Sequence, residues 1–267
     1  MAHGKQYPDS ILESLARRLH DHSMTDALHE ALEGQRPVAI MGGHGLERRH
    51  PVYRMVARIA FKLTQAGYTM LSGGGPGAME ATHVGAWFAH YDLETMDAAI
   101  AQLSVRPDGA KPGEEFADPD WLQRAWAVRE RWPVSEPEYH SIGIPTWLYG
   151  HEPPAPFATR IAKYFANSVR EEGLLAVATY GVVFARGSAG TTQEIFQDAC
   201  QNHYGSFGSR SPMILLGRQF WTEERPVWPL LERVAQGKVY DELLFLTDDE
   251  DAVVRKIQSY NPEVYRV

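Results

Sequence analysis

The sequence predicts an α/β fold: a Rossmann-like, doubly wound parallel sheet with helices on both faces. Short apolar runs alternate along the chain with stretches in which apolar residues recur at helical spacing. Central strands of a parallel sheet are buried on both faces, so they read as continuous apolar runs of this kind. Two of the runs end in glycine-rich turns that open a helix, as βαβ units do.

The first predicted element is an N-terminal helical extension, residues 1–36. Apolar residues recur at helical spacing over residues 9–33. Gly34 and Pro37 are residues that end helices, so we expect two short helices before the first strand. We expect these helices to pack against the main body of the protein.

A single domain is predicted over residues 37–267, and it begins with two strand–helix units. PVAIMGG, from residue 37, reads as a buried strand, and the helix that follows it over 51–66 stops at Gly67. YTMLSG reads as the second strand, and a helix over 77–90 follows it. This order of elements predicts neighbouring parallel strands joined by crossover helices.

Residues 92–156 interrupt the alternation and are predicted to be an insertion within this domain. The segment is rich in proline and contains four tryptophans, Trp121, Trp126, Trp132 and Trp147. Its stretch WLQRAWAVRERW reads as one amphipathic helix. The insertion could be a lid, a partner surface or additional packing, and the sequence does not choose among these.

The alternation resumes after the insertion and continues toward the C-terminus. The predicted elements are the strands GVVFA (181–185), PMILLG (212–217) and LLFLT (243–247), helices over 190–202 and 227–236, and a last helix near the C-terminus. Thr247 and Glu250 have the spacing of a capping box, which predicts that the last helix opens there.

Composition narrows the class of protein. The 267 residues are 44% hydrophobic and 22% charged, which is typical of a globular protein. The net charge is −8 without a Lys/Arg cluster, so we expect no nucleic-acid partner. The single cysteine, Cys200, and the lack of an apolar run near the ~20 residues of a membrane span predict a cytoplasmic protein without a membrane partner. H-E-x-x-H and C-x-x-C motifs are absent, so we expect no metal site.

Two glycine-rich stretches carry the functional signal, SGGGPGAME at 72–80 and ARGSAGTTQE at 185–194. Each follows a predicted strand and opens a predicted helix, where backbone N–H groups and the helix dipole can hold a phosphate. The alternative is that each is only a tight strand-to-helix turn. The dinucleotide pattern G-x-G-x-x-G fails at Ala78, no Walker A lysine follows, and Arg186 stands where a G-x-S-x-G nucleophile elbow needs glycine.

At these two stretches the chain resembles the LOG (Lonely Guy) family of Rossmann-like nucleotide-binding proteins, which are often mislabelled lysine decarboxylases. The family's GGG-x-x-G-x-M motif is similar to GGGPGAM, residues 73–79, which is one residue shorter. Its P-G-G-x-G-T-x-x-E motif is similar to RGSAGTTQE, residues 186–194, with Arg186 in place of proline and Ser188 in place of glycine.

The resemblance implies a nucleoside 5′-monophosphate phosphoribohydrolase, a nucleosidase that cleaves the N-glycosidic bond to a free base and ribose 5-phosphate. The family's catalytic glutamate corresponds to Glu194, which we expect in the first turn of its helix, where it could stabilise an oxocarbenium-like ribose or activate water. The family's arginine corresponds to Arg170, with Arg160 as the other candidate. The residues expected to bind substrate or phosphate are Gly73, Gly74, Gly75, Gly77, Met79, Gly187, Ser188, Ala189, Gly190, Thr191 and Thr192.

The resemblance also implies an AMP-like nucleoside monophosphate as ligand, no cofactor, and a homodimer or higher homo-oligomer. Two other functions stay open: a non-catalytic nucleotide-binding or sensing protein, and another phosphoester enzyme. The departures at Arg186 and Ser188 favour binding, whereas Glu194 favours catalysis. A glutamate near a helix start is also favoured by the helix dipole alone, and Arg170 could pair with Glu171 or Glu172 at the surface.

Overall fold

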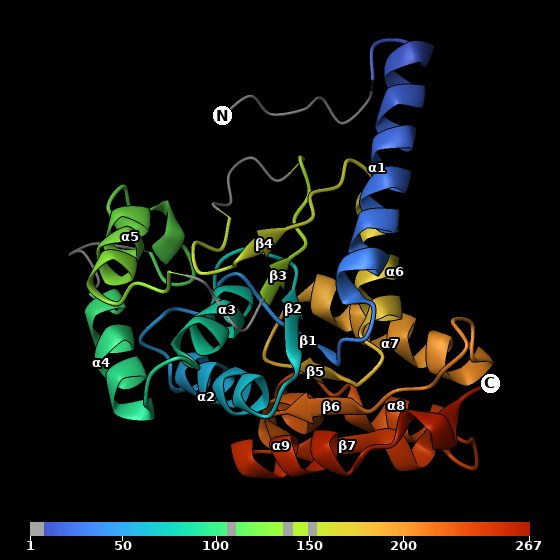
Figure 1. Ribbon diagram of the computed structural model, residues 1–267. Helices are drawn as coiled ribbons and strands as arrows, with labels where there is room; N and C mark the ends of the chain where they lie inside the picture. The colour runs from blue at the N-terminus through green and yellow to red at the C-terminus, as the bar shows by residue number, and fades with distance from the viewer. Residues whose placement is uncertain (1–7, 106–110, 136–140, 149–153) are drawn as a thin grey trace.

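The computed structural model describes residues 8–105, 111–135, 141–148 and 154–267. Its centre is a sheet of seven parallel strands in the order β4-β3-β2-β1-β5-β6-β7 (Figure 1). The strands are β1 Pro37–Met41, β2 Thr69–Ser72, β3 Ser141–Gly143, β4 Arg160–Ile161, β5 Val182–Phe184, β6 Met213–Leu216 and β7 Leu244–Thr247. The predicted Rossmann-like α/β fold with a parallel sheet is confirmed.

Helices cover both faces of the sheet. The helices are α1 Ile11–Leu32, α2 Pro51–Gln65, α3 Ala78–Phe88, α4 Leu93–Leu103, α5 Trp121–Arg131, α6 Asn167–Val177, α7 Ala189–Tyr204, α8 Trp228–Ala235 and α9 Glu250–Ser259, with short segments η1 Glu115–Ala117, η2 Phe220–Glu224, η3 Asp241–Leu243 and η4 Pro262–Tyr265. Side chains alternate along a strand, so Val38 and Ile40 pack with α2, α3 and α9, whereas Ala39 and Met41 pack with α1, α6 and α7.

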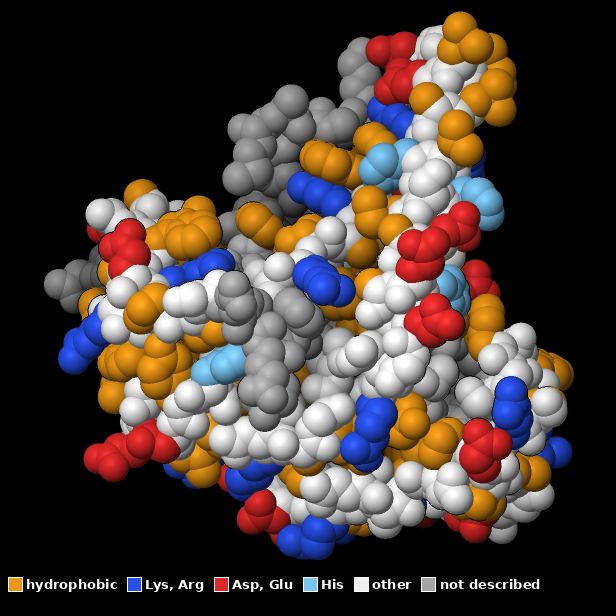
Figure 2. All heavy atoms as spheres, in the orientation of Figure 1, with side chains coloured by type: hydrophobic (Ala, Val, Ile, Leu, Met, Phe, Trp, Pro, Cys, Tyr) orange, Lys and Arg blue, Asp and Glu red, His pale blue; other side chains and the backbone are white. Residues whose placement is uncertain are grey.

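The N-terminal extension is one helix of 22 residues, not the two short helices predicted. The Ser10 side chain caps it by accepting a hydrogen bond from the Glu13 N–H. Buried Leu28 and Leu32 attach its C-terminal end to the body, but its first half projects from the body (Figure 1), contrary to the expected packing. Apolar side chains at the tip are in contact with solvent (Figure 2): Ile11, Leu12, Leu15 and Leu19 are 73%, 74%, 59% and 66% exposed.

The segment predicted to be an insertion contributes to the sheet as well as to its covering. Within it, α4 packs against α3, and α5 packs against α4 (Figure 1). The predicted amphipathic helix is confirmed as α5. Residues 141–143 form β3, which lies between β2 and β4 in the sheet. A strand of three residues, Ser-Ile-Gly, is too short to give an apolar run, so the sequence did not reveal it.

The last helix, α9, begins after Asp249 and not at the predicted capping box. Asp249 is its N-cap, and its side chain accepts a hydrogen bond from the Asp251 N–H at 2.8 Å. Thr247 is still the last residue of β7, and its hydroxyl accepts from the Asp249 N–H instead. The pairing of β7 with β6 therefore holds Thr247 in the sheet and moves the helix start by two residues.

The topology places one edge of the sheet in the position of a ligand site. The chain passes from β1 to β2 on one side and later returns to β5 on the other side of β1. The carboxyl ends of β1 and β5 thus form a topological switch point, where folds of this class bind their ligands. Both glycine-rich stretches lie on this edge, after β2 and after β5. None of the helices in the described ranges is long and apolar enough to cross a bilayer.

Candidate functional site

The loop after β1 holds the two predicted glycine loops together. Its Gly43 N–H donates a hydrogen bond to the Arg186 carbonyl at 2.9 Å, which ties it to the loop after β5. The Gly43 carbonyl accepts from the Ala78 N–H at 3.3 Å, which ties it to the loop after β2. A Cβ atom on Gly77, whose φ is +70°, would lie 2.4 Å from that carbonyl oxygen, so only glycine fits there. Sequence analysis did not single out the loop after β1.

The glycine loop after β2 is buried. Its Gly73, Gly74, Gly75 and Gly77 all lie inside the protein, and Met79 is half-buried. The Gly74 N–H donates to the Ser72 hydroxyl at 3.1 Å, and the Gly74 carbonyl accepts from the Ala155 N–H at 2.8 Å. The backbone groups of this loop are thus partly used inside the protein. The predicted contact of these five residues with a ligand stays a prediction.

The loop after β5 is open to solvent, and it leads into α7. Ser188, Ala189 and Gly190 are exposed, Ser188 makes no side-chain cap, and the first turn of α7 contains no acidic residue. The N–H groups at the start of α7 are therefore available to an anion. Thr191 is buried against Gly187. A Cβ atom on Gly187 would lie 2.0 Å from the Thr191 Oγ1, so a larger residue at position 187 would clash with this side chain. The hydroxyl of half-buried Thr192 donates to the Ser188 carbonyl at 3.1 Å.

Of the two candidate arginines, Arg170 is the one that lies in the charged cluster with Glu194. Arg170, on α6, is buried, and its guanidinium donates to the Ile144 carbonyl at 3.3 Å, to Asn167 Oδ1 at 2.9 Å and to Glu171 Oε1 at 3.2 Å. A Cβ on Gly73 would lie 3.2 Å from its Nη1, so it reaches the loop after β2. Arg160 is exposed on the edge strand β4.

Glu194 is a buried carboxyl in the second turn of α7, not in the first turn as predicted, because the helix begins at Ala189. Burial raises the pKa of Glu194 to about 7; the Arg170 charge opposes this rise and the Glu171 charge adds to it. No hydrogen-bond donor in the described ranges reaches its carboxyl group. Glu171 is linked to the same helix, since the Gln193 side chain donates to its Oε2 at 3.2 Å.

Arg186, the unusual residue of the second motif, is paired within the protein. Its Nη2 lies 2.5 Å from Glu224 Oε2, and its guanidinium lies over the Phe220 ring, 4.5 Å from the centroid. Both partners are on η2, so the arginine fixes that segment beside the loop. The side chains of Arg186 and Glu224 are 35% and 43% exposed, so the pair is accessible to solvent.

Two further buried titratable groups near the site gave no sequence signal. His83, on α3, lies between the hydroxyls of Ser72 and Ser141, at 2.8 and 2.9 Å, and burial lowers its pKa to about 3. It is a neutral link between β2 and β3. Asp198 lies one turn after Glu194 on α7; burial raises its pKa well above its ordinary value, and its Oδ2 has no hydrogen-bond partner in the described chain.

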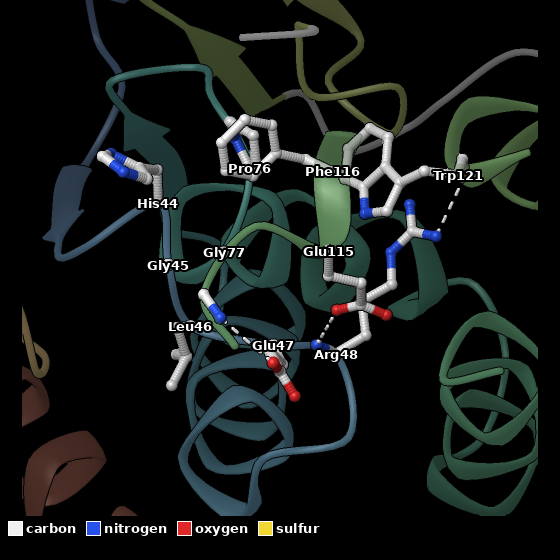
Figure 3. A pocket seen from close by; sticks show the side chains of 11 residues that line it. His44, Gly45, Leu46, Glu47, Arg48, Pro76, Gly77, Glu115, Phe116 and Trp121 are labelled. Atoms are coloured by element: carbon white, nitrogen blue, oxygen red, sulfur yellow. Dashed lines mark hydrogen bonds between the residues drawn. The ribbon is translucent and has the colours of Figure 1, made fainter. Parts of the chain in front are cut away.

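A pocket that the sequence did not predict lies at the other side of the loop after β1 (Figure 3). Residues 44–48 form one wall, Pro76 and Gly77 form another, and residues from the predicted insertion, including Glu115, Phe116 and Trp121, close it. The hollow has a volume of about 190 Å³ that includes space open to solvent. Within the described ranges, no three His, Cys, Asp or Glu side chains come together as a metal site.

Fold and site together define an α/β protein in which the loops after β1, β2 and β5 meet at one edge of a parallel sheet, and the loop after β5 is open to solvent. No protein-family model and no curated protein matches the chain. A solved structure of the molybdenum cofactor binding protein from the phototrophic bacterium Rippkaea orientalis is 14% identical, over 84% of this chain and 96% of that one, with a TM-score of 0.49. A Moco carrier protein from Chlamydomonas reinhardtii is 13% identical, over 84% and 99%, with a TM-score of 0.48.

These findings correct the resemblance to the LOG family. The solved structures found are described as proteins that bind or carry the molybdenum cofactor, which is a different family. The predicted phosphoribohydrolase (nucleosidase) activity and the AMP-like ligand depended on that resemblance, and both are corrected with it. The physical reason is that a glycine-rich turn between a parallel strand and a helix recurs in Rossmann-like folds whatever they bind. In this chain the first such turn is buried.

Proposed function

We propose that the protein binds a small molecule through an anionic group, such as a phosphate, at the start of α7. The observation that carries the proposal is the open N-terminus of this helix at the β1–β5 switch point. Ser188, Ala189 and Gly190 are exposed there, and neither a capping side chain nor a first-turn carboxylate occupies the N–H groups. Those N–H groups and the helix dipole supply the positive potential that an anion needs.

The cluster around Glu194 gives this site a proton. With a pKa of about 7, the Glu194 carboxyl is protonated in a large part of the molecules at neutral pH, and it can then donate to an anion or at least not repel it. Arg170 adds a buried positive charge whose guanidinium is fixed by Asn167, Glu171 and the Ile144 carbonyl. The proposed function is ligand binding without cleavage of a bond. The compartment we propose for the protein is the cytoplasm, which the single cysteine predicts.

The test is to place a negative charge at the first residue of α7. Ala189→Glu introduces a carboxylate beside the N–H groups, while Ala189→Gln adds a neutral side chain of the same size. Titration calorimetry would use sulfate, inorganic phosphate, pyrophosphate and the molybdenum cofactor named for the neighbouring structures. We expect Ala189→Glu to weaken anion binding by about tenfold and Ala189→Gln to change it by less than about twofold.

Stability distinguishes lost binding from lost structure in this test. A carboxylate near a helix start stabilises the helix by about 0.3–1 kcal/mol, so Ala189→Glu should melt no lower than the wild type. Equal anion affinity in the two variants, or no anion binding by the wild type, would contradict the proposal.

A further inference from the structure

Arg186 brings a positive charge close to the start of α7. It is the second residue before Ser188, the residue that precedes α7, and two residues of extended chain span at most about 7 Å. The Gly43 N–H donates to the Arg186 carbonyl at 2.9 Å, so the backbone of Arg186 is held at the switch point between β1 and β5. From this position a long arginine side chain can reach a ligand that is bound at the start of α7.

The guanidinium of Arg186 has N–H donors left for a ligand. It lies over the Phe220 ring, 4.5 Å from the centroid, and a guanidinium on an aromatic ring can still donate from its edge. Of its five N–H donors, one on Nη2 is used within the described part of the chain, for Glu224 Oε2 at 2.5 Å. The Arg186 side chain is 35% exposed, so the other donors can meet a solute.

The ion pair of Arg186 with Glu224 can be exchanged for another one. The Glu224 side chain is 43% exposed, so both members of the pair are in contact with solvent. An exposed ion pair contributes little to stability, because water solvates either charge alone. A phosphate group offers the guanidinium two parallel N–H bonds, which is the geometry that arginine favours. Glu224 can therefore remain in water when Arg186 binds another anion.

The charge of Arg186 also acts on the start of α2, on the β1 side of the switch point. His50 is the N-cap of α2, and its Nδ1 accepts from the Val52 N–H at 3.1 Å. Burial lowers the pKa of His50, the Arg186 charge lowers it further, and the Glu47 charge opposes both. The positive potential of Arg186 thus extends across the switch point, from η2 to α2.

We propose that Arg186 binds a second anionic group of the ligand whose first anionic group lies at the start of α7. The inference deepens the proposed function and rests on it. Because the guanidinium lies on η2, beside the helix start and not over it, it meets a second group and not the first. The ligand class is a molecule with two adjacent anionic groups, as in a diphosphate. Glu224 competes with the second group for the guanidinium.

The test compares inorganic phosphate with pyrophosphate by titration calorimetry on the full chain. The variants are Arg186→Gln, Glu224→Gln and the two together. Their controls are Arg225→Gln and Glu223→Gln, which make the same changes of charge at exposed positions in η2 or directly after it.

The preference for pyrophosphate is the quantity that should change. We expect the wild type to bind pyrophosphate about tenfold more tightly than phosphate. Arg186→Gln should lose most of this preference while its phosphate affinity changes by less than about twofold. Glu224→Gln should bind pyrophosphate a few-fold more tightly, and both controls should resemble the wild type.

The double variant shows whether Glu224 acts through Arg186. We expect it to bind pyrophosphate as Arg186→Gln does, because without the guanidinium Glu224 has nothing to compete for. An ion pair that only fixes η2 would leave the preference for pyrophosphate unchanged in every variant, and that result would overturn the inference. If Arg186→Gln does not fold, as circular dichroism would show, Glu224→Gln decides, since it keeps the guanidinium in place.

The outcomes separate this inference from the proposed function. An equal loss of both anions in Arg186→Gln would overturn the inference, because one group would then contact both places. Pyrophosphate binding that depends on Arg186 but is unchanged in Ala189→Glu would also overturn it. Phosphate binding that Ala189→Glu weakens would leave the anion site at α7 standing in the first case. If the wild type binds neither anion, the proposed function fails and the inference fails with it.

Discussion

The two glycine-rich loops look alike in sequence but differ in the structure. The loop after β2, residues 73–77, is buried, and its Gly74 carbonyl accepts a hydrogen bond from Ala155. The loop after β5 is exposed at Ser188, Ala189 and Gly190, and its helix start is uncapped. Glycine therefore has two uses on the same edge of one sheet. In the first loop it permits close packing of backbone on backbone, and in the second it leaves N–H groups open to a ligand.

The ion pairs beside the two loops differ in the same way. Arg48 and Glu80 are 1% and 0% exposed in their side chains and lie beneath the first loop, whereas Arg186 and Glu224 are 35% and 43% exposed beside the second. A charge that loses its partner in the interior cannot be solvated, whereas a surface charge can. The comparison predicts that substitutions around the first loop unfold the protein and that those around the second change binding.

The largest effect is expected from removing Arg48. Arg48→Ala leaves the Glu80 carboxylate buried without its partner, which should lower the free energy of unfolding by about 3–5 kcal/mol. Arg186→Ala, the matched control at the second loop, should lower it by about 1 kcal/mol or less. Urea denaturation of both variants measures the difference. Similar losses in the two variants would mean that the first ion pair has no special structural role.

A glycine exchange tests the packing of the loops directly. Gly77→Ala places a Cβ 2.4 Å from the Gly43 carbonyl oxygen at a φ of +70°, so we expect a loss of about 2–4 kcal/mol. Gly190 has open space around it and lies within α7, so Gly190→Ala should stabilise the protein by about 0.5–1 kcal/mol. Thermal melting of the two variants shows whether each melts below or above the wild type. A Gly77→Ala protein as stable as the wild type would refute the packing argument.

The charge of Glu194 should make stability depend on pH. Its pKa in the folded protein, about 7, is above the ordinary 4.5, so ionisation is disfavoured by folding. Stability is thus unaffected below pH 4.5, falls as pH rises from there to 7, and stays reduced above 7. Glu194→Gln should therefore be more stable than the wild type by about 1–3 kcal/mol at pH 8, and the gain should vanish near pH 4.5. If Glu194→Gln were more stable than the wild type by the same amount at pH 8 and pH 4.5, this would contradict a raised pKa of Glu194.

The smallest expected effect concerns anion affinity. Sulfate keeps its charge between pH 5 and 9, so any pH dependence of its binding comes from the protein. We expect sulfate to bind a few-fold more weakly at pH 8 than at pH 6, because ionised Glu194 repels it, and Glu194→Gln should bind equally at both. The measurement is calorimetric titration at the two pH values. A pH dependence that persists in Glu194→Gln would assign the effect to another group.

The sequence predicted five of the seven described strands of the sheet, and its site residues stay a prediction. Runs such as PVAIM and TMLS are buried on both faces, so their local pattern is sufficient to identify them. It missed β3 and β4, which have three and two residues, and it divided α1 into two short helices. Arg170 and Glu194 lie in one charged cluster, since the charge of Arg170 acts on the pKa of Glu194, and their predicted role at a ligand stays a prediction.

The sequence by itself determined the alternation of strands and helices and the positions of the glycine turns, because periodicity and backbone freedom are local properties of the chain. Only the tertiary structure decided which glycine loop is buried and which is open, that Arg48 in the loop after β1 pairs with Glu80 on α3, and that one Glu115 oxygen has no hydrogen-bond partner among the described residues. These features depend on segments that are distant along the chain and meet only in the fold. Burial, which sets the pKa of Glu194 and the cost of an unpaired charge, does not exist until they meet.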